Sequence, residues 1–184
     1  MPSVTLFYQQ SSVPADRTGW TFDGSSVITP FKMSAIFSGS VTFVDTISVS
    51  SRCELDVVDI TGKVQQAINR SGISGGVAHL LVAGSTAGLT TIEFEPGAVA
   101  DLKEAFSRLA PREMEYAHNA RWGDGNGHSH VRAAILGPDI TVPVRDGNAL
   151  LGTWQQIILV EFDTRGRNRK IYLTLTGEAA LKEV

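Results

Sequence analysis

The sequence predicts an α+β domain in which mainly antiparallel, β-sandwich-like sheets are accompanied by two main helices. Many short apolar segments are separated by Gly, Pro and Asp residues, a pattern typical of strands joined by turns. Two longer segments, 61–70 and 96–109, instead carry apolar residues at helical spacing. With 184 residues, of which 42% are hydrophobic, the chain can bury a sizeable core.

The chain is predicted to divide into residues 1–45, an N-terminal extension of unknown role, and residues 46–184, the main domain. The extension is rich in Ser, Thr, Phe and Gly and contains short alternating runs such as SVTLFY. An added hairpin, an arm that clasps a second subunit and a wrongly chosen start, with Met33 as the alternative, all remain open.

The first helix is predicted around residues 61–70, with Asp59 or Thr61 as its cap and the glycine-rich SGISGG after it. Its expected core-facing residues are Val64, Ala67 and Ile68. The second helix is predicted over 96–109, and Pro111 prevents its easy continuation. One face of this helix is expected to carry Val99, Leu102, Phe106 and Leu109.

The strands are predicted from short apolar or alternating runs. In chain order these are TISVSS (46–51), CELDVVDI (53–60), VAHLLVA (77–83), LTTIEF (89–94), VRAAIL (131–136), DITVPV (139–144), NALLG (148–152), QQIILVEF (155–162) and KIYLTLTGE (170–178).

The charge composition argues against nucleic acid and anionic membranes as partners. Sixteen basic and nineteen acidic residues give a formal net charge of -3, so no polycationic surface is expected. Cys53 is the only cysteine and cannot form an internal disulfide, and neither a secretory signal nor a membrane-spanning run is recognisable. These features predict a soluble, cytoplasmic protein.

The segment HNARWGDGNGHSHVRA (118–133) gathers three of the four histidines and is expected to be a loop that leads into a strand. On an extended segment His128 and His130 would point to the same face, and His118 would supply a third nitrogen. Three protein ligands with one open position are typical of a catalytic zinc-type site. An H-x-H pair on an ordinary strand face is the alternative interpretation.

Other residues of this segment and the fourth histidine have less distinctive patterns. Asp124 and Asn126 are candidate metal ligands, partners that orient the imidazoles, or turn formers, because Asp-Gly and Asn-Gly favour turns. Asn126 is also a candidate substrate-binding residue. His79, inside an apolar run, is expected to be a hydrogen-bonded core or interface residue.

A second constellation lies in AGSTAGLTTIEFEPG (83–97). Ser85 and Thr86, between two glycines, could line an anion-accepting turn, although the P-loop pattern is absent. Glu93 is a candidate general base, and the nearby Glu95 is equally explained as a solvated strand end.

Near the C-terminus, Trp154 and Gln155 beside an apolar strand are candidate substrate-binding residues. Arg167, which alternates with Arg165 and Arg169, is a candidate phosphate ligand, although a solvated turn or an intersubunit salt-bridge set also explains these arginines.

Several motifs in order give the chain a resemblance to the YjbQ-like family of secondary thiamine-phosphate synthase-like proteins. They are GSTAGLTTIEFEPG, HNARWGDGNGHSHVRAAILGP, VPVRDG, LLGTWQQI and the final R-x-R strand, within about residues 47–178. The resemblance implies an α+β fold, a homotrimer, a polar, metal-capable pocket near a subunit boundary, and weak thiamine phosphate formation in some members.

The chain departs from the family pattern at two positions. Many members carry a histidine where this chain has Gly84, and a different residue where it has His128. We hypothesise that His128 takes over the ligand role of the absent histidine, beside His118 and His130, which match the family.

Two functions are compatible with these residues. One is a metal-dependent enzyme that acts on a small phosphorylated substrate, with zinc or magnesium at His118, His128 and His130, and with Glu93 and His130 as catalytic residues. The other is a trimeric metal- or ligand-binding protein whose histidine site is structural. A homotrimer burying more than about 1,000 Å² at each contact is expected, with a dimer as the weaker alternative.

Overall fold

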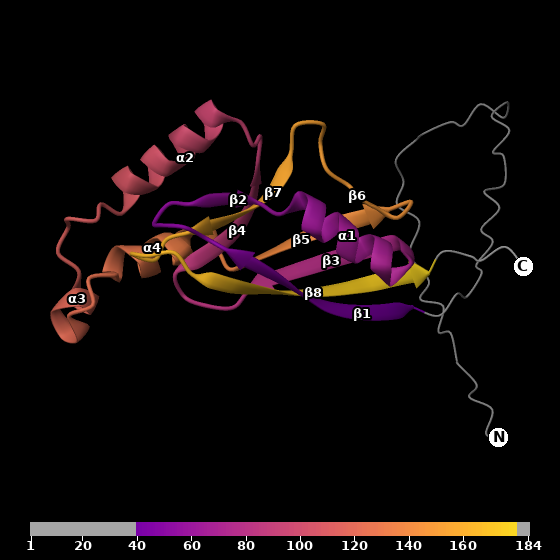
Figure 1. The fold of residues 1–184 in the computed structure, drawn as a ribbon, viewed down its shortest axis with the longest axis horizontal. Coiled ribbons are helices and arrows are strands. Elements are labelled where there is room, and N and C mark those ends of the chain that lie inside the picture. The colour runs from indigo at the N-terminus through magenta and orange to yellow at the C-terminus, as the bar shows by residue number, and fades with distance from the viewer. Residues whose placement is uncertain (1–39, 180–184) are drawn as a thin grey trace, which may run out of the picture. The chain divides into compact units, whose positions relative to one another are not determined.

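The computed structural model describes residues 40–179, which form two antiparallel sheets and four helices (Figure 1). Residues 1–39, most of the predicted N-terminal extension, lie outside this range. The elements in chain order are β1 (Val41–Ser50), β2 (Val57–Asp59), α1 (Thr61–Ser71), β3 (Ile73–Val82), β4 (Ala87–Ile92), α2 (Pro96–Leu109), α3 (Ala117–Trp122), α4 (Gly127–Leu136), β5 (Asp139–Arg145), β6 (Asn148–Ala149), β7 (Gln156–Glu161) and β8 (Asn168–Ala179).

The larger sheet has the strand order β1-β8-β3-β5-β6, and all its strand pairs are antiparallel. Along β8 buried and exposed residues alternate, so that Ile171, Leu173 and Leu175 point into the core. Ile47 lies opposite Ile171 on one side, and Leu80 lies opposite Leu173 on the other. This register places the apolar residues of three strands on one face.

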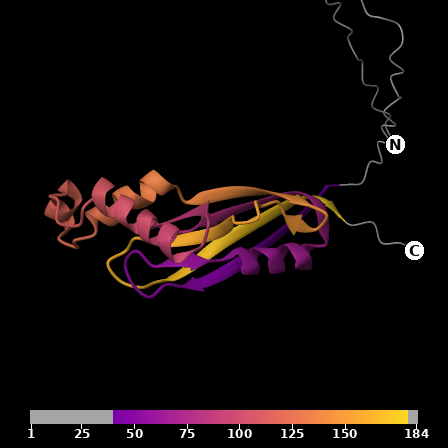
Figure 2. The same cartoon turned by 90° about the horizontal axis from the view of Figure 1, so that it is seen from above.

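The smaller sheet has the order β2-β7-β4, and its central strand is buried on both faces. Ile157 and Leu159 pack into the core shared with the larger sheet and α1, whereas Ile158 and Val160 pack with Phe106 of α2 and Ala133 of α4. Figure 2 shows α1 along one side of the strands and the other helices gathered toward one end. The predicted sandwich-like α+β architecture is therefore confirmed, with helices over the second sheet.

The two main helices form where the sequence predicts them. In α1, Val64, Ala67 and Ile68 are buried as expected. The N-cap residue is Ile60, so neither predicted cap is correct, although the N–H of Thr61 donates to Oδ1 of Asp59 (2.8 Å). Phe106 is buried in α2, but Leu109, predicted on the same face, is 62% exposed at the last turn.

The expected loop and strand between residues 117 and 136 are wrong, because this segment forms α3 and α4. The buried positions 127, 128, 129, 132 and 133 recur with a helical period. Several of these buried positions hold polar side chains, so the pattern of hydrophobic residues did not predict the helix. Two other predicted strands are much shorter than expected: only 57–59 of 53–60, and 148–149 of 148–152, are extended.

The boundary predicted at residue 45 falls inside β1, since Val41 already pairs with Gly177 of β8.

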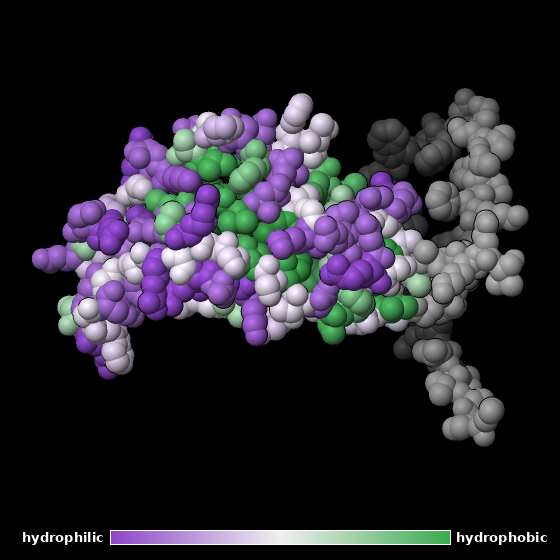
Figure 3. Space-filling view, viewed as in Figure 1, coloured by the Kyte–Doolittle hydropathy of each residue, from purple (hydrophilic) through white to green (hydrophobic). Residues whose placement is uncertain are grey.

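Figure 3 shows hydrophilic residues over the end of the domain that carries α2 and α3, and hydrophobic residues reaching the surface at the middle of the same face. Within the described residues, no helix is long and apolar enough to cross a membrane.

Candidate functional site

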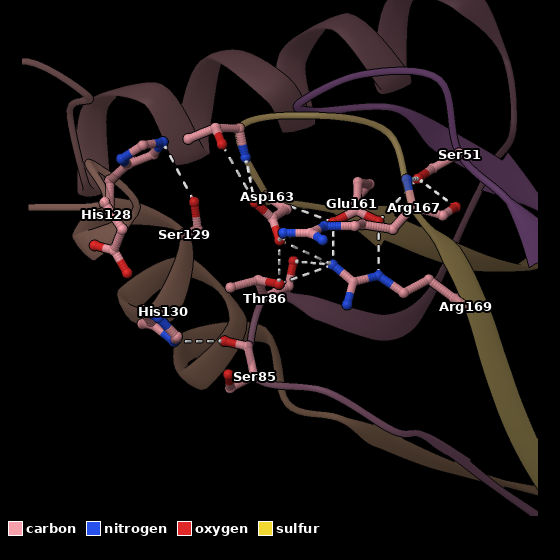
Figure 4. A network of polar contacts seen from close by, with 12 residues as sticks. Ser51, Ser85, Thr86, His128, Ser129, His130, Glu161, Asp163, Arg167 and Arg169 are labelled. Atoms are coloured by element: carbon pink, nitrogen blue, oxygen red, sulfur yellow. Dashed lines mark hydrogen bonds and ion pairs between the residues drawn. The ribbon is translucent and has the colours of Figure 1, made fainter. Parts of the chain in front are cut away.

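Helix α4 sends His128 and His130 in different directions. Residues two apart on a helix are rotated by about 200° around its axis, whereas on the predicted strand they would have shared a face. His128 is fully buried, and its Nε2 lies 3.0 Å from Oε1 of Glu54. His130 is half-buried and reaches the Ser85 turn instead (Figure 4).

A backbone carbonyl fixes the tautomer of His130. Nδ1 of His130 lies 3.1 Å from the carbonyl oxygen of Ser85, which can only accept, so Nδ1 must carry the proton. In the neutral ring Nε2 then keeps a lone pair. His130 can therefore accept a proton or bind a cation through Nε2, beside the exposed side chain of Ser85.

Helix α3 brings a second imidazole to the same place. The rings of His118 and His130 have centroids 4.5 Å apart and planes inclined by 54°. Nε2 of His118 lies 3.2 Å from Oδ2 of Asp124. With its amide nitrogen turned toward Asp124, Asn126 donates to both carboxylate oxygens of that residue (3.1 and 3.2 Å), and the same carboxylate accepts from Nε2 of His118. The loop between the helices thus orients His118.

The donor atoms here are of the kinds that divalent metals bind, namely imidazole nitrogen and carboxylate oxygen. However, within residues 40–179 no group of three His, Cys, Asp or Glu side chains is placed to hold an ion. His128 is directed to Glu54 and not to the Gly84 turn, so the hypothesis that it replaces the absent family histidine lacks support. The described part of one chain does not form the predicted three-histidine site.

Thr86 is a structural link and has little freedom to bind a substrate. Its side chain is buried, its hydroxyl donates to Oδ2 of Asp163 (3.2 Å), and it accepts from Nη2 of Arg169 (2.8 Å). Of the two predicted turn residues, only Ser85 is exposed. Ser85 is therefore the hydroxyl that a ligand can reach.

A buried ion-pair network adjoins the Ser85 turn through Thr86 (Figure 4). Arg169 donates from Nε to Oε2 of Glu161 (2.7 Å), and both side chains are buried. Gly84 has φ 139°, and an added Cβ there would lie 2.9 Å from Nη1 of Arg169. The guanidinium group thus occupies the space behind Gly84, and a side chain at this position would displace it.

Arg167 belongs to this network, although the sequence suggested a phosphate ligand. Its Nε donates to Oδ2 of Asp163 (2.8 Å), and its backbone N–H donates to the Ser51 hydroxyl (2.8 Å). Burial opposes the charged form of Asp163, but hydrogen bonds from Arg167, Thr164 and Thr86 outweigh burial and lower the pKa of Asp163 below its usual value. Arg167 therefore neutralises a buried carboxylate.

The remaining predicted residues lie at the other end of β4. This strand has six residues and at about 3.3 Å per residue spans roughly 20 Å, with the Ser85 turn before it and Glu93 after it. Gln155 is on the Glu93 side, where its amide donates to the Thr91 hydroxyl (2.8 Å), and the neighbouring Trp154 is 70% exposed. Glu93, Trp154 and Gln155 are not brought to His130 within one chain.

Sequence reasoning missed Glu161, Asp163 and the buried role of Arg169 beside the Ser85 turn. It also missed Glu54 and Arg132, which pair on the other face of α4. One signal was available, because Glu161 and Asp163 follow an apolar strand at alternate positions and Arg167 and Arg169 precede another. Alternate residues share a strand face, so the two pairs could have been matched. His79 was expected in the core or at an interface, but in this chain it is exposed and contacts the Thr141 hydroxyl (3.0 Å).

Known proteins are similar to this chain in both sequence and fold. A UPF0047 protein of Methanothermobacter thermautotrophicus is 36% identical over 132 residues, 72% of this chain and 89% of that protein. The UPF0047 protein YjbQ of Salmonella typhimurium is 37% identical over 107 residues, 58% of this chain and 77% of that protein. The crystal structure of a YbjQ-like protein of unknown function from Sulfolobus solfataricus P2 has a TM-score of 0.73 and 35% identity, and the match covers 76% of this chain and 100% of that one.

The matches extend over the part of the chain that carries both sheets and the histidine helices. The family model described as UPF0047 protein YjbQ-like matches residues 45–178, from within β1 almost to the end of β8. The same motifs that gave the resemblance, from the Ser85 turn to the R-x-R strand, lie within this range. The chain therefore belongs to the YjbQ-like UPF0047 family.

Proposed function

We propose that the protein is a cytoplasmic enzyme that acts on a small phosphorylated molecule at the surface formed by the Ser85 turn, α3 and α4. One observation carries this proposal: the bond between Nδ1 of His130 and the Ser85 carbonyl leaves a lone pair on Nε2, beside an exposed hydroxyl and a second imidazole. An acceptor, a donor and a chargeable ring at one place suit proton transfer next to a phosphate group.

The chain's own residues would divide the work as follows. The Ser85 hydroxyl donates a hydrogen bond to a phosphate oxygen, and Nε2 of His130 accepts a proton. His118, held by Asp124 and Asn126, donates a proton or a hydrogen bond from the adjacent ring. Glu93, Trp154 and Gln155 can contribute only from a second subunit, because β4 separates them from His130 in the same chain.

The reaction class that we propose is thiamine-phosphate synthase-like. In such a reaction a pyrimidine diphosphate joins a thiazole phosphate, and pyrophosphate leaves. Both substrates carry phosphate groups, which fits a site with hydrogen-bond donors and proton-transfer groups at one surface. The support for this particular reaction is the family resemblance of the motifs around Ser85 and His130, and we expect the rate to be low.

A divalent metal ion, zinc or magnesium, is a separate proposal. His118, His130 and Asp124 supply suitable donor atoms, but a complete ligand set would need groups beyond those assembled here. Elemental analysis of the purified protein tests this directly. If the metal sits at this surface, His130→Ala should abolish binding. Full metal content in His130→Ala would rule the surface out as the metal site.

The alternative function is a trimeric metal- or ligand-binding protein with no dedicated catalysis. The hydrogen bonds that hold His118 through Asp124 and Asn126 favour it, because a rigid, satisfied cluster suits binding as well as chemistry. The two functions differ in turnover. An enzyme releases pyrophosphate repeatedly, whereas a binding protein saturates at one ligand per site.

The test uses two substitutions of His130, each of which places an amide near the position of one ring nitrogen. Asparagine retains an amide N–H near the Nδ1 position but removes Nε2, whereas glutamine presents its amide near the Nε2 position. Because Nε2 is the proposed proton acceptor, both variants should lower pyrophosphate release, followed by ³¹P NMR, by about 100-fold or more. Lys63→Gln, at an exposed position on α1, is the control. Wild-type turnover in His130→Asn would refute the proposal.

We further propose a homotrimer. The outward face of the larger sheet supports assembly, since Tyr172 on β8 lies opposite Leu81 on β3, and both are exposed (48% and 39%). Val44 on the neighbouring β1 is 71% exposed. A run of large apolar residues across three adjacent strands is typical of a surface that another protein surface covers.

A further inference from the structure

The second face of α4 borders a cavity that the proposed site does not use. This cavity has a volume of about 500 Å³ and is lined by Glu54 and its neighbours after β1, by Arg112 and its neighbours after α2, and by Arg132 of α4. His130 points away from it, toward Ser85. Whatever the cavity binds is therefore independent of the proposed function.

Two hydrogen bonds hold the guanidinium group of Arg132, and one of its nitrogens makes none within the described residues. The residue is only 2% exposed; its Nε donates to the Ala110 carbonyl (3.0 Å) and its Nη1 to Oε1 of Glu54 (2.7 Å). These two bonds fix the plane of the guanidinium group. Nη2 makes no hydrogen bond within the described residues, and Arg132 lines the cavity. This nitrogen is the part of the group left for a ligand.

A second guanidinium group is held beside the first by the same carboxylate. Nη1 of Arg112 donates to Oε2 of Glu54 (3.1 Å), and the Arg112 side chain is 57% exposed. Glu54 also lies 3.0 Å from Nε2 of the buried His128 ring, so both of its oxygens have partners. Glu113 lines the cavity too, but forms no ion pair in the part of the chain that the structure describes. Two guanidinium groups thus share one carboxylate at the wall.

We propose that this cavity binds the oxyanion group, phosphate or carboxylate, of a small molecule. Two guanidinium groups with spare N–H donors match the geometry of such a group, and burial of Arg132 strengthens its hydrogen bonds relative to those made in water. Glu54 is the internal counter-ion that keeps both arginines in place in the free protein. An incoming oxyanion accepts from the N–H groups that Glu54 leaves free, against the opposing charge of Glu113 at the same wall.

The experiment is an NMR titration of the full chain, with inorganic phosphate and acetate added separately at constant ionic strength. We expect the amide signals of Cys53, Leu55 and Thr164, which line the cavity, to shift with at least one anion. Phosphate alone or acetate alone would identify the source. Shifts confined to Ser85 and His130 would overturn this proposal and leave the proposed function standing.

Variants at the two arginines complete the test. Arg112→Gln should weaken binding by about tenfold or more, because it removes a charge-assisted donor at an exposed position where folding is unaffected. Arg132→Lys retains the charge but loses the fork, and should also weaken binding. Arg108→Gln, at an exposed arginine paired with Glu104, should bind like the wild type. Wild-type affinity in Arg112→Gln would overturn the proposal.

Discussion

His128 and His130 show how neighbouring residues of one type acquire different chemistry. His130 contacts a carbonyl at the surface, so its second nitrogen remains available. His128 is fully buried, and its Nδ1 has no hydrogen-bond partner within the described residues. Burial is the main cause that lowers the pKa of His128, with Arg132 and Arg112 acting in the same direction and Glu54 opposing them.

The lowered pKa of His128 makes folding stability depend on pH. The native ring resists protonation, whereas in the unfolded chain it titrates near its ordinary value of 6.5. The contribution of His128 to stability is thus present above pH 6.5 and is lost as the pH falls through the lower native pKa. We expect the melting temperature of His128→Gln to fall less steeply than that of the wild type between about pH 7 and about pH 5. Parallel curves would contradict this.

Ser85 and Thr86 are adjacent but should respond differently to substitution. Thr86→Val removes one buried hydrogen-bond partner from each of Asp163 and Arg169, so the free energy of unfolding in urea should fall by about 1–3 kcal/mol. Ser85→Ala, at an exposed position, should change it by less than about 0.5 kcal/mol while weakening the binding of a phosphorylated ligand. Equal losses of stability would show that the turn is not supported through Thr86.

Among the elements, α4 is the clearest example of a helix that the sequence did not predict. Its buried positions include His128, Ser129 and Arg132, so the helical period is present but is not apolar. The close approach of α4 to β4 depends on Gly88, where an added Cβ would lie 2.7 Å from both Leu136 and the Gly137 carbonyl. This tertiary contact has no local signature around residues 127–136.

The elements that were predicted correctly have local causes. Val64, Ala67 and Ile68 give α1 an apolar stripe, and Pro96 begins α2. Buried and exposed residues alternate along β8 of the larger sheet, whereas β7 is apolar from Ile157 to Val160, which suits a strand covered on both faces. For the candidate site, the sequence identified Glu93 and His130 as candidate residues. Their separation in the fold depends on the length of β4, and the spacing of residues in the sequence does not reveal it.

Substitutions of the two glutamates after β4 should distinguish an effect on the stability of α2 from an effect on catalysis. The carboxylate of Glu95 accepts from the N–H groups of Gly97 (2.7 Å) and Ala98, and these bonds lower its pKa and cap α2. Glu95→Ala should therefore lower the melting temperature, whereas Glu93→Ala, at an exposed side chain without a capping role, should not. If Glu93→Ala alone abolishes turnover, Glu93 acts in catalysis. Equal melting temperatures for the two variants would exclude the cap.

At the scale of the whole molecule, the outward face of the larger sheet, which no other described element covers, predicts assembly. Tyr172→Asp or Val44→Asp places a charge among exposed apolar residues and should convert a trimer into monomers, measured by light scattering at micromolar concentration. Leu109→Asp, at a 62% exposed position on α2, is the control and should remain trimeric. A wild-type protein that is a monomer under these conditions would contradict the homotrimer.

The strand orders also determine when the domain can fold during its synthesis. The middle strand of the smaller sheet, β7, lies between β2 and β4, and β8 lies between β1 and β3. Both β7 and β8 are translated after the strands on either side of them, so neither sheet can be completed while the ribosome is still adding residues before 156. Until then β1 has no partner strand, and β3 can pair with β5 along one edge only, a state prone to aggregation. A message cut short before β7 would therefore yield a chain with both sheets incomplete, and such products should be substrates for chaperones and proteases.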